Sequence, residues 1–356
     1  MKRKNSWAQQ AAPLLFIVAL LALGSPAFAS EPWRAALTLE TALETAAKDQ
    51  TLVVIDVFAT WCGPCKQLDR ETFSDPRADA LLSKMVALKI DGESGPGEQL
   101  VETYNVVGYP TVLFIGPDGR EVDRVFGFVD ANTFVDMASA YAEGRDTLEA
   151  LRAALEADPT NLELRKKVFF KHVLRGDETD ALKQAEILRA QAPDDQELWA
   201  ELQFDLGKYL YLRGRKDYAL ARTYFEVLLQ RLPDSSWSQS ALYPYARALN
   251  GDGQEAKAIA MLEDYVATSA EPDKAGAYNT AAWFSFKNDV RLQWGVEMAQ
   301  KGLVLAPNDA ALWDTLAELQ FKLGQVEAAV ESEQKAAGLD EDSYYDEQIA
   351  KFQGGL

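Results

Sequence analysis

The 356-residue sequence predicts an alternating α/β domain followed by an all-helical repeat array. Two observations carry this prediction. Between residues 31 and 145, short β-branched apolar runs alternate with amphipathic stretches, as in α/β domains. Beyond about residue 145 no strand pattern remains, and the composition turns to Ala, Leu, Glu, Lys and Gln with helical spacing. The length agrees, since about 150 residues per domain predicts about two domains.

Residues 1–29 have the order of a secretory signal peptide. Basic residues at positions 2–4 precede the apolar run Leu14–Leu23, and Ala27-Phe28-Ala29 forms a small-x-small site, so we expect cleavage after Ala29. The apolar run has half of the about 20 residues that a membrane-spanning helix needs. The leader predicts a mature chain that works outside the cytoplasm, where disulfides persist.

The region 31–145 divides into helices, strands and one hairpin. The run 52–58 is typical of a central strand covered on both faces, because its apolar residues do not alternate with polar ones. The other predicted elements are helices at 39–48, from the cysteine segment to about 73, at 74–84, from 98 to 104 and at 132–143, a strand at 85–90, and a hairpin of 111–115 with 121–126.

Cys62 and Cys65 are the two cysteines of the sequence and lie at the predicted strand-to-helix junction. Helix amides and the helix dipole at such a position lower the pKa of a thiol and favour the attacking thiolate. Cys62 would attack a substrate disulfide, and Cys65 would resolve the mixed disulfide. The alternatives are an inert disulfide or two buried thiols. A disulfide that encloses only two residues would, however, constrain the unfolded chain little.

The composition excludes several function classes. With 55 acidic and 36 basic residues, the net charge of −19 argues against nucleic acid as a partner. Without the leader, 33 basic and 55 acidic residues remain, and the net charge becomes −22. One histidine, His172, and two cysteines offer few metal ligands, so we expect no metal and no other cofactor.

Four motifs in register resemble the thioredoxin family. Trp61-Cys62-Gly63-Pro64-Cys65-Lys66 is similar to its active-site motif, and Asp56 matches its buried aspartate. Gly108-Tyr109-Pro110-Thr111 matches the segment with its cis-proline, and Gly127 matches the glycine after its last strand. The segment 72–76 also resembles the thioredoxin-like periplasmic domain of a membrane thiol–disulfide reductase. The resemblance implies a thioredoxin fold for residues 31–145.

The resemblance also implies roles for single residues. Cys62 would be the nucleophile and Cys65 the resolving thiol, while Asp56 would be buried and relay a proton to or from Cys65. Pro110 would be cis and place its backbone beside the disulfide, where an incoming chain can pair. The expected substrate-binding residues are Trp61, Gly63, Pro64, Tyr109 and Pro110.

Two positions depart from the family pattern. The lysine that relatives often place near the buried aspartate falls on Ala87, with Lys89 two residues later, which predicts a differently tuned proton relay. Tyr109 stands where an aliphatic residue is common, and it would either alter substrate preference or stack on the surface.

Residues 148–345 are predicted to form four to five tetratricopeptide-type repeats. Prolines recur at positions 159, 193, 233 and 307. The spacing of the first two is 34 residues, the length of one tetratricopeptide repeat. Gly176 and Gly324 fall where the two helices of a unit would turn. Such arrays bind peptides or partner proteins in a concave groove, although a structural extension or a dimerisation surface is an alternative. One basic cluster consists of Arg165, Lys166, Lys167 and Lys171, and a solvated helix face explains it as well as a role in the groove does.

Two functional hypotheses follow. The first is a periplasmic thiol–disulfide oxidoreductase whose repeats recruit protein substrates with disulfides. Its CGPC sequence favours reduction, and a membrane thiol–disulfide reductase would supply the electrons. The second is a chaperone-like adaptor whose repeats hold clients and whose thiols protect or trap them.

Overall fold

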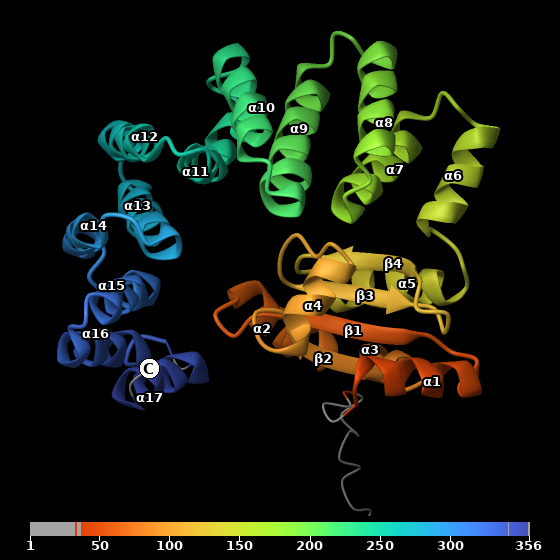
Figure 1. Ribbon diagram of the computed structural model, residues 1–356, viewed down its shortest axis with the longest axis horizontal. Coiled ribbons are helices and arrows are strands. Elements are labelled where there is room, and N and C mark those ends of the chain that lie inside the picture. Colours follow the sequence, from red (N-terminus) through yellow and green to blue (C-terminus); the bar gives the residue numbers. More distant parts are fainter. Residues whose placement is uncertain (1–32, 34–36, 341, 355–356) are drawn as a thin grey trace, which may run out of the picture. The chain divides into compact units, whose positions relative to one another are not determined.

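The computed structural model describes residue 33, residues 37–340 and residues 342–354. The predicted leader at 1–29 lies outside these residues. The N-terminal part is built on a four-stranded sheet with strand order β2-β1-β3-β4 (Figure 1). Strand β1 (Val53–Phe58) runs parallel to β2 (Val86–Asp91) and antiparallel to β3 (Thr111–Ile115). Strand β4 (Glu121–Phe126) pairs antiparallel with β3 and completes the predicted hairpin.

Helices cover both faces of this sheet. Residues 53–57 of β1 are all buried, as expected for a central strand between two layers. Val54 and Phe114 pack on one face against Leu68, Phe73 and Phe134, and alternate strand residues pack on the other face against the remaining helices. The helices are α1 (Leu39–Asp49), α2 (Gly63–Leu68) with the π-helical turn η1 (Asp69–Phe73), α3 (Pro76–Leu82), α4 (Pro96–Thr103) and α5 (Ala131–Ala142).

Caps and prolines explain where these helices begin. The side chains of Thr38, Asp75 and Asp130 each accept a backbone N–H of the following turn, as expected for N-cap residues. Helix α4 begins at Pro96, slightly earlier than predicted, because proline fits the first turn of a helix. The predicted alternating α/β domain is confirmed.

The rest of the described chain is helical, as predicted. Its helices follow one another in short-linked pairs, an arrangement consistent with repeats. They are α6 (Leu148–Ala157), α7 (Leu162–Arg175), α8 (Glu178–Gln191), α9 (Gln196–Asp205) with the π-helical segment η2 (Leu206–Arg215), α10 (Tyr218–Arg231), α11 (Ser236–Gly251), α12 (Glu255–Thr268), α13 (Lys274–Asn288), α14 (Leu292–Leu305), α15 (Ala310–Lys322), α16 (Val326–Ala337) and α17 (Ser343–Gly354).

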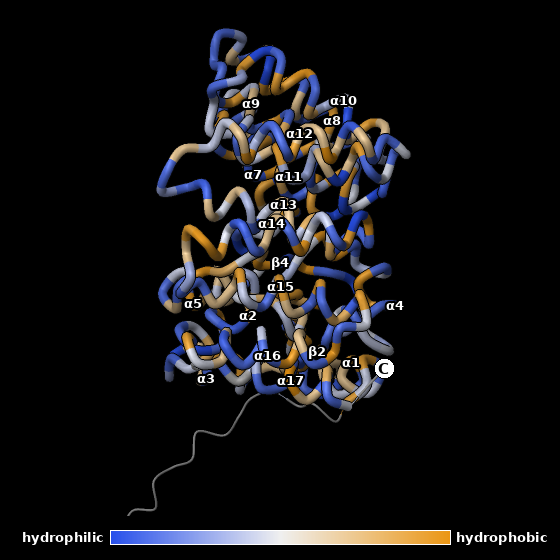
Figure 2. The backbone as a smooth tube through the Cα atoms, turned by 90° about the vertical axis from the view of Figure 1, so that its left-hand side faces the viewer, coloured by the Kyte–Doolittle hydropathy of each residue, from blue (hydrophilic) through white to orange (hydrophobic). Residues whose placement is uncertain are grey.

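The predicted turn residues have the conformations that the repeat pattern requires. Gly176 ends α7 at φ 76° and Gly324 follows α15 at φ 75°, left-handed conformations in which a Cβ would be strained. Ala181 and Ala329 are fully buried, so that the paired helices can approach closely. Hydrophobic and hydrophilic residues alternate along these helices, as amphipathic packing demands (Figure 2).

The sheet and the first repeat helices share a buried polar junction. Asp123 on β4 has no exposed surface, and its carboxylate accepts the Lys171 ammonium at 2.6 Å and the Leu148 backbone N–H at 2.8 Å. Arg124 donates to the Leu174 carbonyl at 3.0 Å. The interpretation of residues 165–171 as a solvated face is therefore wrong for Lys171, and also for Arg165, which is buried. Lys171 pairs with Asp123, whereas the Arg165 guanidinium donates to the Gln184 side chain and the Pro159 carbonyl.

Candidate functional site

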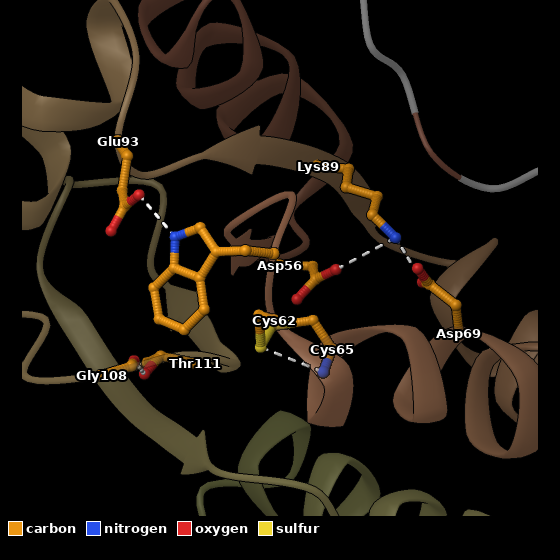
Figure 3. The surroundings of a disulfide bond; sticks show 9 residues. Asp56, Cys62, Cys65, Asp69, Lys89, Glu93, Gly108 and Thr111 are labelled. Atoms are coloured by element: carbon orange, nitrogen blue, oxygen red, sulfur yellow. Dashed lines mark hydrogen bonds and ion pairs between the residues drawn. A yellow bond between two sulfur atoms is a disulfide. The ribbon is translucent and has the colours of Figure 1, made fainter. Parts of the chain in front are cut away.

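The cysteine pair caps the active-site helix. Cys62 and Cys65 form a disulfide, and both residues are buried, with 2% and 4% of their surface exposed. Cys62 is the N-cap of α2, and its sulfur accepts the Cys65 backbone N–H at 3.1 Å (Figure 3). Gly63 and Pro64 form the exposed first turn between them. A thiolate on Cys62 would occupy the same place and accept the same N–H, which stabilises its negative charge.

Asp56 lies behind the disulfide, on the central strand. Its carboxylate is directed from β1 toward the cysteines and toward Lys89 (Figure 3). Asp56 is 1% exposed, and this burial raises the pKa of its carboxyl group from 3.8 to about 7, against the attraction of Lys89. One of its oxygens, Oδ1, has no hydrogen-bond partner. A carboxyl group with a pKa near neutrality can both accept and return a proton under ordinary conditions.

Lys89 supplies the positive charge beside Asp56, which corrects the alignment drawn from the sequence. The parallel register of β1 and β2 places Lys89 opposite Asp56 and Ala87 opposite Val54. The Lys89 Nζ lies 3.5 Å from Asp56 Oδ2 and also binds Asp69. The family lysine is therefore present here. Only the strand register, which counting along one chain does not give, assigns it to position 89.

The loop before β3 lies beside the cysteines. The Tyr109–Pro110 peptide bond is cis, as the resemblance implied. The Pro110 carbonyl accepts the N–H of Gly127, whose φ of 79° explains the glycine there. Thr111 Oγ1 donates to the Gly108 carbonyl at 2.7 Å (Figure 3). Tyr109 is half-buried against the cysteine cluster, and burial raises the pKa of its hydroxyl to about 12, so it stays neutral.

Trp61 is the exposed aromatic residue of the motif, with 37% of its surface accessible. Its indole N–H donates to Glu93 Oε2 at 2.7 Å (Figure 3). Its ring meets Tyr109 edge-on and lies 6.3 Å from the ring of Trp283 on α13. Lys287, one helical turn after Trp283, places its Nζ 4.4 Å from the Trp61 ring centroid.

Lys66, the last residue of the motif, contacts the C-terminal helix. Its Nζ lies 2.9 Å from the Asp342 carboxylate and 4.0 Å from the centroid of the Tyr344 ring. The described residues form one compact unit, so these repeat residues belong to the surroundings of the site. Sequence reasoning missed Glu93, Trp283, Lys287 and Asp342, and no local pattern marks them, because their proximity depends on tertiary packing.

His172 is buried on α7 and its Nδ1 lies 3.0 Å from Asp177, away from the cysteines. Within the residues that the structure describes, no group of three or more His, Cys, Asp or Glu side chains is arranged to hold a metal ion.

Residues 39–142 match the family model of the thioredoxin-like domain. These residues form a thioredoxin-like domain. The thiol:disulfide interchange protein DsbD of Actinobacillus pleuropneumoniae is 38% identical over 88 residues, which cover 24% of this chain and 15% of that protein. DsbD of Pseudomonas fluorescens is 34% identical over 111 residues, 30% of this chain and 19% of that protein. The chain thus spans less than a fifth of the length of these curated relatives.

A solved structure also matches part of the chain. A putative disulphide-isomerase from Bacteroides thetaiotaomicron is 38% identical, with a TM-score of 0.29, covering 31% of this chain and 92% of that one. Among the helices that the structure describes, none has the length and hydropathy needed to cross a membrane.

Proposed function

We propose that the protein is a thiol–disulfide oxidoreductase that reduces disulfides in protein substrates. The observation that carries the proposal is the Cys62–Cys65 disulfide at the start of α2 with the buried carboxyl group of Asp56 behind it. The similarity of this chain to thiol:disulfide interchange proteins, 38% identical over 88 residues and 34% over 111 residues, supports the same chemistry.

In the proposed cycle, the reduced enzyme begins with Cys62 as a thiolate. Cys62 attacks one sulfur of the substrate disulfide, a new S–S bond forms, and the other substrate sulfur leaves as a thiolate. Cys65 then loses its proton and attacks Cys62, which releases the second substrate thiolate. Two electrons have passed to the substrate, and the Cys62–Cys65 disulfide remains.

Asp56 is the proposed acceptor of the Cys65 proton. Its burial beside the disulfide and its pKa of about 7 support this role, because the carboxylate form is substantially populated near neutral pH. Lys89 would stabilise that carboxylate. On re-reduction, the same carboxyl group would return the proton to the Cys65 thiolate.

The substrate chain is proposed to pair along the loop before β3. Tyr109 of this loop packs against the two cysteines, and edge-to-edge pairing beside it needs no particular substrate sequence. Gly63 and Pro64 leave the approach to Cys62 open, while Trp61 and Tyr109 provide an apolar contact surface.

The proposal also covers the direction of electron transfer and the cellular location of the protein. The CGPC sequence is that of thioredoxins with potentials of about −270 mV, which favours reduction. We place the mature protein in the periplasm after cleavage at Ala29, with residues 31–145 as the redox domain and residues 148–345 as tetratricopeptide-type repeats. A membrane thiol–disulfide reductase would then restore the thiols. N-terminal sequencing of the exported protein tests the cleavage site.

The decisive experiment uses the exported full-length chain. Reduction of insulin by dithiothreitol in its presence is followed by turbidity, with the double variant Cys62→Ala/Cys65→Ala as the control. Cys65→Ala should accumulate mixed disulfides on Cys62 with defined cysteine-containing clients. An inert wild-type protein that suppresses aggregation as well as the double variant does would favour the chaperone-like adaptor instead.

A further inference from the structure

A group of cations on the repeat helices lies beside the thioredoxin-like active site. Arg213 of η2 donates from Nη1 to the carbonyl of Val107, three residues before Pro110. Lys287 of α13 lies over the ring of Trp61, the residue before Cys62. These two contacts place positive charge next to both segments that a bound substrate would touch.

We add Arg247 on α11 to this group because its charge acts on both Arg213 and Lys287. Burial lowers the pKa of Arg213, and the positive charge of Arg247 lowers it further. Burial also lowers the pKa of Lys287; Glu93 opposes this shift, while Arg247 and Lys322 add to it. Burial raises the pKa of the hydroxyl group of Tyr243, one helical turn before Arg247, and the charges of Arg247 and Arg213 oppose this shift.

None of these three cations forms an ion pair within the described part of the chain. Arg247 makes neither a hydrogen bond nor an ion pair there, and Lys287 makes cation–π contacts but no ion pair. Arg213 binds a neutral carbonyl. The carboxylates of Glu93 and Glu318 attract Lys287 without pairing with it. Glu93 accepts the Trp61 indole N–H, and Glu318 binds Lys351.

Such a group is conspicuous in a chain with a net charge of −19. Some other cations of the repeats are paired, as Arg222 is with Glu226 and Asp252. Clustering like charges is costly unless a partner of opposite charge completes the site. The exposed ring of Trp61 and the half-buried rings of Tyr109 and Trp283 add an apolar platform among these cations.

We propose that Arg213, Arg247 and Lys287 form a specificity surface that selects client polypeptides with acidic residues next to the cysteine under attack. The proposal rests on the proposed reductase function and names its substrate class. The client backbone would pair beside Pro110, its apolar side chains would lie on the aromatic platform, and its Asp or Glu side chains would meet the three cations.

The test uses the full-length reduced protein and synthetic disulfide-linked peptide pairs that become fluorescent on cleavage. Three substrates differ only at the residues flanking the cysteine, which are Glu, Gln or Lys. We expect second-order rate constants in the order Glu, Gln, Lys, with about a tenfold difference between the extremes at low salt. In about 0.5 M salt the difference should largely disappear, because the charges are screened.

The matched variants are Lys287→Glu/Arg247→Glu and the control Arg152→Glu/Lys183→Glu. Both change the net charge equally, but Arg152 and Lys183 are exposed on α6 and α8. The first variant should abolish or invert the preference for the Glu peptide, and the control should keep it. For Lys287→Gln/Arg247→Gln, the ratio of the rate constants for the Glu and Lys peptides should be intermediate. This milder variant is included in case the Glu variant misfolds, and circular dichroism checks the fold of every variant.

The outcomes separate the two proposals. If no peptide is reduced by any form, the reductase function itself fails. If all peptides are reduced at equal rates, or both double Glu variants keep the same preference, only the specificity surface is refuted. Reduction of glutathione disulfide as fast as the Glu peptide, with the same loss in the variant, would assign the cations to a small anionic disulfide and overturn the polypeptide proposal.

Discussion

Asp56→Asn should stabilise the thioredoxin-like domain, and increasingly so as the pH rises. The carboxyl group of Asp56 is buried, and its pKa is about 7 in the folded protein against an ordinary value of 3.8. The folded state therefore holds a proton that the unfolded state has released between these values, so stability falls as the pH rises from about 4 to about 7. Each pKa unit corresponds to about 1.36 kcal/mol, which gives a full penalty of about 4 kcal/mol above pH 7.

Asparagine cannot ionise and escapes this penalty. We expect a gain of about 2 kcal/mol at pH 5.5 and about 4 kcal/mol at pH 8, because the penalty is only half developed at the lower pH. Lys89 keeps an ion-pair partner after the loss of the Asp56 carboxylate, because it also binds Asp69. The same variant should slow insulin reduction, since the proposed proton acceptor is gone, so that stability and activity move in opposite directions.

Hydrogen exchange followed by mass spectrometry measures this effect locally, in peptides that cover β1 and β3 of the oxidised protein. Wild type and variant are compared at the same pH, so that intrinsic exchange rates cancel. Asp118→Asn, which removes an exposed carboxylate, serves as the control and should have no such effect. A gain in stability that is equal at pH 5.5 and pH 8, or a loss at both, would refute the assigned burial and pKa of Asp56.

Three further outcomes follow from the packing. Asp123→Ala should cost about 3–5 kcal/mol, because Lys171 would be left buried without its partner, and exchange should accelerate in β4 and α7 together. Gly97→Ala should lower the melting temperature through a destabilisation of about 3 kcal/mol, since a Cβ there would lie 1.8 Å from the backbone oxygen of Asp91; an unchanged melting temperature would contradict that loop geometry. Lys66→Met should remove the partly exposed ion pair to α17 and speed exchange in that helix about threefold, with β1 unaffected.

Much of the redox domain could be predicted from the sequence because its signals are local. The β-branched run of β1, the turn before β4 and the caps of α1 and α3 each act over a few residues. The cysteine spacing likewise identifies its own chemistry. The assignment of Ala87 failed for the complementary reason, since pairing between strands is a relation between two segments that neither one encodes alone.

The repeat region shows the same limit on a larger scale. The spacing of the prolines and Gly176 indicate helix pairs, because proline and glycine both act on the local backbone. The pairing of Lys171 with Asp123 could not be predicted, because Asp123 lies on a strand 48 residues earlier. Trp283 and Lys287 carry no motif at all, and only the packing of successive helices brings them to Trp61.

The contact of Lys66 with Asp342 joins residues 276 positions apart in the chain. At about 5–20 residues per second, synthesis of such a separation takes roughly 15 to 55 seconds. Domains fold as units from the N-terminus, so the cysteine pair is assembled well before the helices that flank it. A chain that ends before residue 283 thus contains both cysteines but none of the repeat residues that contact Trp61 and Lys66.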